Sequence, residues 1–322
     1  MRLDSKIYVA GHNGLAGSAI LRALNRAGYS NRVLRRHSEL ELTGAAAVAA
    51  FFEQERPEYV FLAAAKVGGI LANDTYPADF IRENLAVQLN VIHEAWRTGV
   101  KRLLFLGSSC IYPRDCPQPM KEEYLLSGPL EQTNRAYAIA KIAGVEMCWS
   151  YNRQHGARFL AAMPTNLYGP GDTYDLRNSH VLPALMLKIH QAKQRGEQQV
   201  TLWGSGRPRR EFLYSDDMAE ACVLLAQLPE GKYDRLVAPA VAPLINIGSG
   251  EDQSIAELAA IVAEATGFTG QFSYDSSKPD GMPRKLLEST RIEALGWKPK
   301  VGLREGIAIA YQDFLKSSAA VK

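Results

Sequence analysis

The sequence predicts an α/β fold, a doubly wound parallel sheet with a smaller C-terminal domain interleaved with it. Three observations predict it. Through the first half of the chain, short apolar segments of strand length alternate with longer amphipathic ones, which is typical of parallel strands joined by helices. A glycine-rich turn lies between the first strand and the first helix. After about residue 167 the alternation gives way to turn clusters and polar loops.

The first strand and helix enclose a glycine loop. We expect residues 6–10 to form a short buried strand, followed by Gly11, Gly14 and Gly17 at the start of a helix. The first glycine permits a tight turn, the second lets the backbone approach a pyrophosphate, and the third lets helix and strand pack closely. Free N–H groups at the helix N-terminus can bind the phosphates, although an ordinary glycine-rich turn is the alternative. The predicted cofactor contacts here are Gly11, Asn13, Gly14, Leu15, Ala16 and Gly17.

The segment after the second strand indicates which dinucleotide binds. Residues 31–34 lead into Arg35, Arg36 and His37, and no carboxylate appears until Glu39. A site for NAD usually has an acidic residue there, which binds the ribose 2′-hydroxyl. Guanidinium groups instead suit a 2′-phosphate, so we predict NADP(H), with a solvated basic turn as the alternative. The predicted contacts in this turn are Arg35, Arg36, His37 and Leu40.

Three more strands and two long helices complete the first half. We expect strands at residues 59–63, 102–106 and 158–163, and amphipathic helices at 77–98 and 136–154. In parallel sheets of this kind, ligands bind beyond the carboxyl ends of the strands. Further cofactor contacts are therefore expected just after these strands. They are Ala64, Leu106, Gly107, Pro164, Asn166 and Leu167.

The second long helix carries a pattern that suits carbonyl reduction. Tyr137 and Lys141 are four residues apart and so lie on one helix face, and Ser108 follows the fourth expected strand. Tyrosine has a pKa of about 10, and a nearby ammonium group can lower a pKa by roughly 1–3 units. A serine hydroxyl can hold the other side of a carbonyl oxygen. Together the three groups can protonate an oxygen while a hydride reaches its carbon.

The chain divides into two interleaved parts. The predicted NADP-binding Rossmann domain spans residues 1–167, and segments near 200–225 and 244–250 are expected to return to it. Residues 168–322 are expected to form mainly a substrate-binding domain. Residues 277–285 are predicted to be a polar loop, because proline, glycine and charged residues dominate them.

Composition argues against several classes of protein. The 322 residues are 47% hydrophobic, which allows a substantial core, and the net charge of +3 is too small to indicate a nucleic-acid partner. No apolar run approaches the roughly 20 residues of a membrane span, so no membrane partner is expected. Four scattered cysteines without zinc-site spacing indicate a reduced, cytoplasmic protein that binds no metal.

The glycine loop and the Ser–Tyr–Lys set resemble those of the extended short-chain dehydrogenase/reductase family. Longer strings are similar to one subfamily, the GDP-L-fucose synthases, which are epimerase/reductases. The resemblance spans nearly the whole chain, with one departure at Asn13, where the family often has a basic residue and where Arg35 and Arg36 can compensate. The similar strings are residues 63–69, 106–113, 164–170, 178–180 and 277–281.

This resemblance implies a substrate and a chemistry. The implied substrate is GDP-4-keto-6-deoxy-D-mannose, a GDP-deoxyhexose whose ketone acidifies the hydrogens on carbons 3 and 5. Cys110 is the implied base and His180 the implied acid for inversion at both carbons, although a lone cysteine or histidine is more often structural. Reduction of carbon 4 by NADPH then involves Ser108, Tyr137 and Lys141. Lys141 and His180 are also implied cofactor contacts.

Binding of the nucleotide sugar is implied for the second half of the chain. Arg210 can bind the diphosphate and Trp203 can pack against sugar or base. Lys188 can reach a phosphate, and Asp280 can bind ribose or base hydroxyls. The alternatives are a solvated basic loop around Arg210 and a core position for Trp203.

Other functions remain open from the sequence. One is another nucleotide-sugar enzyme of the same family, an NAD-retaining 4-epimerase or a dehydratase, which Cys110 and the basic turn argue against. The other is a non-catalytic NADP-sensing module, which often lacks the tyrosine or lysine that this chain keeps. As in related dimers, the helices at 77–98 and 136–154 are expected to pair in a homodimer.

Overall fold

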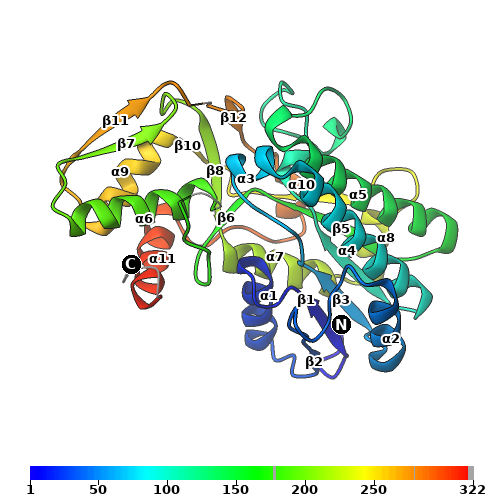
Figure 1. Cartoon of the computed structure of the whole chain (residues 1–322). Helices are drawn as coiled ribbons and strands as arrows, with labels where there is room; N and C mark the ends of the chain where they lie inside the picture. The colour runs from blue at the N-terminus through cyan, green and yellow to red at the C-terminus, as the bar shows by residue number, and fades with distance from the viewer. Residues whose placement is uncertain (177–178, 279, 318–322) are drawn as a thin grey trace.

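Six parallel strands form the central sheet, in the order β2-β1-β3-β4-β5-β9 (Figure 1). The computed structural model describes residues 1–176, 179–278 and 280–317. The order reverses beside β1, so the predicted doubly wound α/β fold is confirmed. The strands are β1 (Ile7–Ala10), β2 (Arg32–Val33), β3 (Tyr59–Leu62), β4 (Arg102–Leu106), β5 (Phe159–Pro164) and β9 (Leu244–Ile247).

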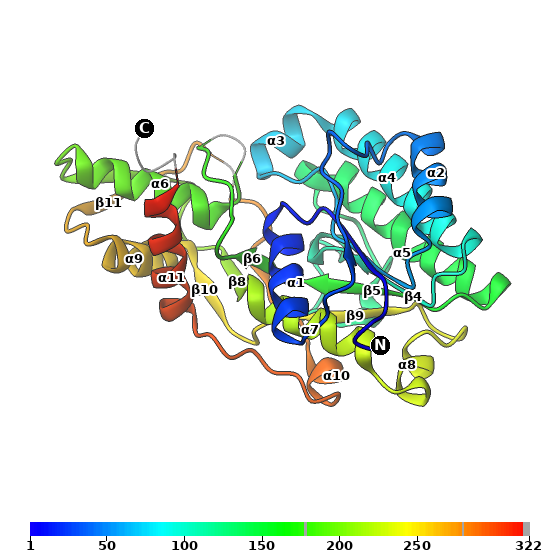
Figure 2. The same ribbon diagram turned by 90° about the horizontal axis from the view of Figure 1, so that it is seen from below.

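Helices cover both faces of this sheet, as Figures 1 and 2 show from two directions. Strands that are buried on both faces favour apolar side chains at most positions, which explains their largely apolar sequences. One face packs against α1 (Leu15–Arg26) and α7 (Ser215–Gln227). The other packs against α2 (Ala45–Glu55), α4 (Pro77–Arg97) and α5 (Arg135–His155).

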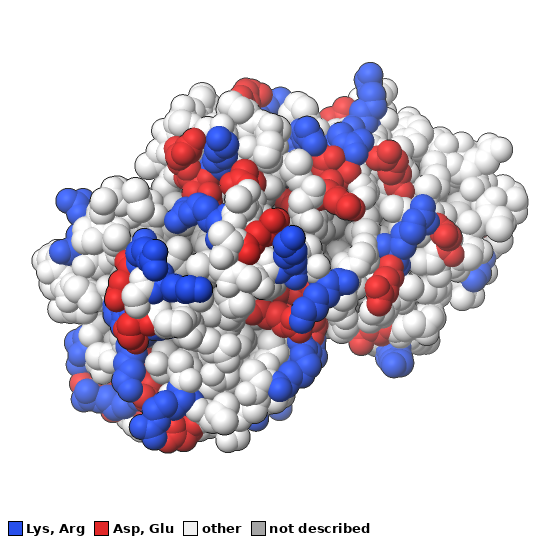
Figure 3. Space-filling view, turned by 180° about the vertical axis from the view of Figure 1, so that it is seen from behind, with Lys and Arg blue, Asp and Glu red and all other residues white. Residues whose placement is uncertain are grey.

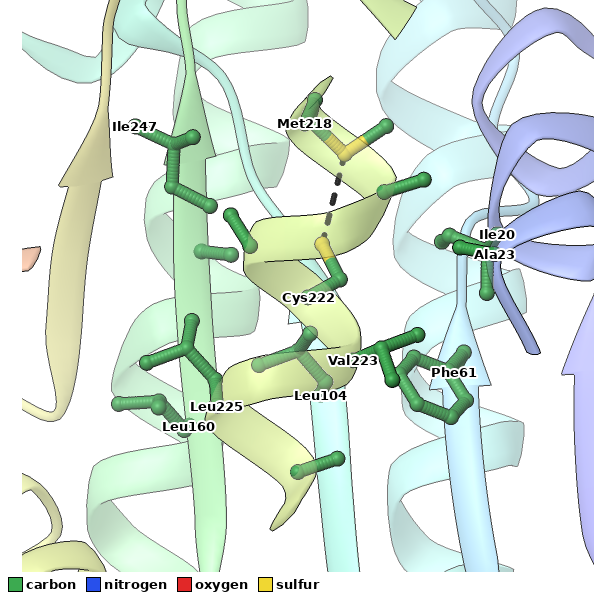
Figure 4. Close-up of a cluster of buried hydrophobic side chains, with 14 of the residues drawn as sticks. Ile20, Ala23, Phe61, Leu104, Leu160, Met218, Cys222, Val223, Leu225 and Ile247 are labelled. Carbon is green, nitrogen blue, oxygen red and sulfur yellow. Dashed lines mark hydrogen bonds between the residues drawn. The ribbon is translucent and has the colours of Figure 1, made fainter. Parts of the chain in front are cut away.

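The core beneath α7 is shown in Figure 4. Met218, Cys222 and Val223 are buried there among side chains of α1 and of the sheet. Residues from distant parts of the chain meet in this core, for example Ile20 of α1 and Ile247 of β9. Burial of this apolar surface fixes α1, and with it the glycine loop that precedes α1, against the sheet.

The second half contributes a smaller group of elements beside the main sheet (Figure 1). Strand β8 (Arg209–Tyr214) pairs with β6 (Asn166–Tyr168), β10 (Asp252–Ser254) and β12 (Arg284–Lys285). Strand β7 (Gln199–Trp203) pairs with β11 (Gln271–Asp275) outside the main sheet. The domain boundary predicted at residue 167 stays a prediction. Around a separate core lie α6 (Val181–Gln194), α9 (Ile255–Thr266) and α11 (Leu303–Lys316).

Short elements complete the chain. The prediction that residues 277–285 form only a loop is wrong at its end, because Arg284 and Lys285 pair with β8 as strand β12. Other short helices are α3 (Ile70–Thr75), α8 (Glu230–Leu236), α10 (Thr290–Glu293), η1 (Ser109–Ile111), η2 (Glu122–Tyr124) and η3 (Gln132–Asn134).

Surface charge is mixed in sign. Figure 3 shows Lys and Arg interspersed with Asp and Glu over the face seen from behind, without a field of one sign. Within the described ranges, no helix has both the length and the apolar character that crossing a membrane requires. Those residues also contain no cluster of three or more His, Cys, Asp or Glu side chains arranged to hold a metal ion.

Candidate active site

A cavity of about 1020 Å³ lies at the carboxyl ends of the central strands. It reaches from the loops after β1 and β3 across β4 and β5 to elements of the second half. Every candidate site residue predicted from the sequence lines this cavity, so the fold brings the whole set together. Their individual roles stay predictions. Of the similar strings, Asn178 and Pro279 lie outside the described residues.

The glycine loop at one end of the cavity has the geometry of a phosphate site. Gly11 has a φ of +84°, and a side chain there would place its Cβ 2.7 Å from the backbone nitrogen of Ala64. A Cβ on Gly17 would collide with the Gly11 carbonyl oxygen. Gly14 begins α1 without a side-chain cap, and the first turn has no acidic residue. The N–H groups of α1 therefore remain available to a pyrophosphate, and the residues present fit a dinucleotide.

The basic turn presents one uncommitted guanidinium to this end of the cavity. Arg35 is engaged elsewhere, because it forms an ion pair of 2.5 Å with Glu55. His37 pairs with Glu41 at 2.6 Å. Arg36 is exposed, and in the part of the chain that the structure describes its side chain has no ion pair. The structure therefore favours Arg36 over Arg35 and His37 as the group that meets a 2′-phosphate.

The loop facing Arg36 supplies a second sign of a charged ligand. The Nδ1 atom of His12 is buried and, among the residues that the structure describes, has no hydrogen-bond partner. Burial, and then the positive charge of Arg36, lower the pKa of His12. Because His12 is then neutral and the Arg36 guanidinium has no ion pair, this end of the cavity can accept the negative charge of a phosphate.

Tyr137, Lys141 and Ser108 meet as predicted, but their electrostatics differ from the prediction. The Lys141 ammonium donates to the Leu106 carbonyl oxygen at 2.7 Å and lies 5.8 Å from the centre of the Tyr137 ring. Burial lowers the pKa of Lys141 to about 7. Burial, and then the negative charge of Cys110, raise the pKa of Tyr137, although a hydrogen bond with Ser108 opposes this. The expected lowering of the Tyr137 pKa by Lys141 is therefore wrong for this structure, and Tyr137 keeps its proton.

Cys110 sits among positive and polar groups. Its Sγ accepts hydrogen bonds from Lys285 Nζ at 3.1 Å and from Asn134 Nδ2 at 3.2 Å. Its backbone N–H donates to the Ser108 hydroxyl at 3.3 Å. Burial alone would raise the pKa of the thiol, but the Lys285 charge, the Ser108 hydrogen bond and the Arg210 charge outweigh it and lower the pKa.

His180 approaches from the other part of the chain. It is the residue before α6, and its side chain is accessible from the cavity. Desolvation by the cavity walls, and then the charge of Lys285, lower the pKa of His180 below its ordinary value. A negatively charged ligand is needed to counter this before His180 holds a proton at neutral pH.

The four residues predicted to bind substrate line the part of the cavity that the second half of the chain forms. The Arg210 guanidinium donates to the Arg209 carbonyl at 2.8 Å, and burial lowers its pKa. Lys188 donates to the Thr201 carbonyl at 2.5 Å. The Asp280 carboxylate accepts from the backbone and hydroxyl of Ser205 at 2.6 and 2.8 Å. Trp203 is 52% exposed, so the alternative of a core position is wrong.

Sequence reasoning missed two partners of Cys110 and one acidic group. Lys285 lies in a segment predicted to be a loop, and nothing nearby in the sequence indicates its contact with Cys110. Asn134 precedes α5, and asparagine before a helix usually caps that helix, so the sequence did not indicate its contact with Cys110. Asp172 also lines the cavity, and burial raises its pKa to about 7. Only the run of turn residues before Asp172 gave a signal.

A comparison of the sequence with protein families matches residues 7–238 to the NAD dependent epimerase/dehydratase family. The chain belongs to this family. Within the family it is 55% identical to GDP-L-fucose synthase 1 of Arabidopsis thaliana, over 98% of this chain and 94% of that protein. It is 50% identical to the GDP-L-fucose synthase of Escherichia coli (strain K12), over 97% of each chain.

Two solved structures share the fold over nearly the whole chain. A GDP-mannoheptose C4 reductase from Campylobacter jejuni with NADP bound is 41% identical, with a TM-score of 0.89 over 98% of this chain and 100% of that one. A GDP-L-fucose synthetase from Naegleria fowleri bound to NADP is 28% identical, with a TM-score of 0.86 over 98% and 95% of the two chains. The family resemblance inferred from motifs is thereby confirmed.

Proposed function

We propose that this chain is an NADP-dependent epimerase/reductase that converts GDP-4-keto-6-deoxy-D-mannose into GDP-L-fucose. Identities of 50–55% to GDP-L-fucose synthases over nearly the full chain support the overall reaction. NADP(H) is the cofactor, and the solved relatives that carry NADP support this. One observation carries the proposal. The Cys110 thiol, which accepts a hydrogen bond from the buried ammonium group of Lys285, lines the same cavity as Tyr137, Lys141 and His180.

The cofactor is held at the first end of the cavity. The backbone N–H groups in the first turn of α1 would bind its pyrophosphate, and Arg36 would bind its 2′-phosphate. When bound, NADPH supplies the hydride that reduces carbon 4 of the sugar. The GDP moiety occupies the opposite end, where Arg210 and Lys188 offer positive charge to its diphosphate.

Epimerisation uses the acidity of hydrogens next to the ketone. Ser108 and Tyr137 donate hydrogen bonds to the ketone oxygen and stabilise the enolate that forms when a neighbouring proton leaves. The Cys110 thiolate takes the proton from one face of the ring and becomes a thiol. His180, once charged, returns a proton to the opposite face and inverts the carbon. Since carbons 3 and 5 both flank the ketone, one base and one acid can serve both.

Reduction uses the proton that Tyr137 retains. Because burial raises the pKa of Tyr137, its hydroxyl is protonated in the resting site and can donate to the oxygen on carbon 4. Ser108 holds the same oxygen. Lys141 lies behind the Tyr137 ring and offers positive charge when the phenolate forms.

A second candidate is a GDP-sugar C4 reductase that performs no epimerisation. The similarity in structure to a GDP-mannoheptose C4 reductase favours it. The two candidates share the cofactor site and the Ser108–Tyr137–Lys141 set, so only the chemistry at Cys110 and His180 separates them.

The test is to mix the purified chain with NADPH and GDP-4-keto-6-deoxy-D-mannose, with NADH in a parallel cuvette. We expect loss of the reduced-nicotinamide absorbance, faster with NADPH, and GDP-L-fucose as the product by chromatography and NMR. A reduced product that keeps the mannose configuration at carbons 3 and 5 would support the reductase instead. A folded chain that binds NADPH but oxidises none of it would contradict both and would support a sensing module.

We further propose that the protein is a homodimer. Leu85 and Leu89 of α4 are 37% and 55% exposed, which supports pairing through the face formed by α4 and α5. Light scattering coupled to gel filtration should give twice the mass of 35.4 kDa. A mass of one chain at micromolar concentration would contradict this.

A further inference from the structure

Lys285 is a buried cation whose position depends on the pairing of two short strands. It lies on β12, where its register partner on β8 is Arg210. The residue is 8% exposed, and its ammonium group lies 3.1 Å from the Cys110 sulfur. Across residues 1–176, 179–278 and 280–317, no carboxylate forms an ion pair with it.

Its neighbour on the same strand has a different environment. Arg284 is exposed and forms an ion pair with Asp252 of β10, away from Cys110. The two residues therefore carry the same charge on the same two-residue strand, but only Lys285 faces the cavity.

A buried ammonium group is costly unless an anion or several acceptors compensate it. The thiolate form of Cys110 is the anion within reach of Lys285. Other titratable groups near this pair are Arg210 of β8 and Tyr137 of α5, which interact with Cys110, and His180 before α6, which interacts with Lys285. None of these three supplies a negative charge at neutral pH, and Asn134 adds only a neutral donor.

We propose that Lys285 is a positioning residue that holds Cys110 as its thiolate, so that the base is complete only when β12 is seated on β8. This inference rests on the base role of Cys110 in the proposed function. The thiolate forms before substrate arrives, takes the carbon-bound proton as a thiol, and is restored when that proton passes to solvent.

The contact between Lys285 and Cys110 joins the two halves of the chain at the proposed base. Cys110 lies on η1, directly after β4 of the main sheet, whereas Lys285 comes from the second half. A buried carboxylate, Glu211, supports the segment after β12 by accepting the backbone N–H of Leu287 at 2.9 Å. The base would therefore lose its charge if β12 and β8 moved away from the end of β4.

The test measures the ionisation of Cys110 without reference to turnover. Iodoacetamide reacts with thiolates, so its rate against pH reports the midpoint of Cys110 ionisation, and peptide mass spectrometry isolates that residue. Cys116 is an internal reference, since it is accessible and burial raises its pKa without a contribution from Lys285. The variants compared are Lys285→Met, Lys285→Arg and, as the matched control, Arg284→Met.

We expect Lys285→Met to slow alkylation of Cys110 at pH 7 about tenfold or more and to move its midpoint upward, because removal of a close opposite charge shifts a pKa by roughly 1–3 units. Lys285→Arg should restore most of the rate, and Arg284→Met should change neither rate nor midpoint. An unchanged midpoint in Lys285→Met, whatever its rate, would overturn the inference. If that variant does not fold, Lys285→Gln serves the same comparison, since it keeps a donor and removes the charge.

A failure of the proposed function would look different. Cys110→Ala that still washes deuterium into carbons 3 and 5 would remove Cys110 as base, while the alkylation midpoints would still decide whether Lys285 ionises the thiol. If Cys110→Ala loses exchange and Lys285→Met keeps both the wild-type midpoint and wild-type exchange, the base role stands and the role of Lys285 is overturned.

Discussion

The groups proposed for reduction and those proposed for proton abstraction differ in origin and in electrostatics. Ser108, Tyr137 and Lys141 come from one edge of the main sheet and the helix that follows it, and burial there opposes charge. Cys110 instead collects its partners from both halves of the chain, and positive groups overcome the effect of burial. Proton donation by Tyr137 and proton abstraction by Cys110 can thus take place in one cavity. Both groups are buried, but only Cys110 has positive groups close enough to stabilise its anion.

The largest expected effects come from substitutions that remove the reduction groups and the proton-abstraction group one at a time. Tyr137→Phe should lower cofactor oxidation about 1000-fold or more, because it removes the proton donor, while deuterium exchange at carbons 3 and 5 continues at a reduced rate. Cys110→Ser should instead stop deuterium exchange at carbons 3 and 5, because a serine hydroxyl is far less acidic than a thiol. Exchange is followed by NMR in deuterium oxide, and oxidation by absorbance.

Binding of NADPH, measured by fluorescence titration, is the control for both variants and should stay within about threefold of wild type. If Cys110→Ser exchanges at the wild-type rate, Cys110 is not the base. If Tyr137→Phe oxidises NADPH normally, the reduction region is assigned wrongly.

The glycine loop gives the next largest effect and tests a region that the local sequence describes well. Gly17→Ala places a Cβ against the Gly11 carbonyl, so the loop must shift, and NADPH affinity should fall about 30-fold, consistent with an overpacking cost of roughly 1–3 kcal/mol. Gly231→Ala on α8 is the control, because nothing lies within 4 Å of its Cβ and the residue does not line the cavity. Equal losses in both variants would contradict the packing argument.

How far the sequence predicts each region follows from this difference. The glycine loop and Ser108 each follow an expected strand, and Tyr137 and Lys141 are one helical turn apart. The strand pattern and this spacing therefore place them at one edge of the sheet. Lys285 depends on a pairing between β12 and β8, which are some 75 residues apart, and two residues carry no periodicity that predicts a strand. The Tyr137 pKa was predicted in the wrong direction, because sequence shows which charges are near but not how deeply a group is buried.

Substitutions in the basic turn, which includes Arg35 and Arg36, should have a smaller effect on cofactor binding. Arg36→Gln should raise the KM for NADPH about tenfold and leave the KM for NADH unchanged, because only NADPH carries a 2′-phosphate. Arg35→Gln should change the preference less than about threefold, since the guanidinium is already paired with Glu55. Steady-state kinetics with both cofactors decides, and a larger effect from Arg35 would contradict the assignment.

The smallest effect concerns stability. Folding lowers the pKa of Lys141 from its ordinary 10.5 to about 7, so between those values the unfolded chain binds more protons and stability rises with pH. Lys141→Met removes this dependence. Between pH 7 and 9 the stability of the cofactor-free wild type should therefore gain roughly 2 kcal/mol on the variant. Denaturant melts at the two pH values measure this, and parallel changes in both proteins would contradict the lowered pKa.

The central claim is that one cavity performs both inversion and reduction. The direct test is the wild-type reaction in deuterium oxide with NADPH, followed by NMR and mass spectrometry of the GDP-sugar product. The proposal predicts deuterium on both carbon 3 and carbon 5 and protium on carbon 4, whose hydrogen does not come from solvent. A reduced product with protium on carbons 3 and 5 would contradict it and would leave only a C4 reductase.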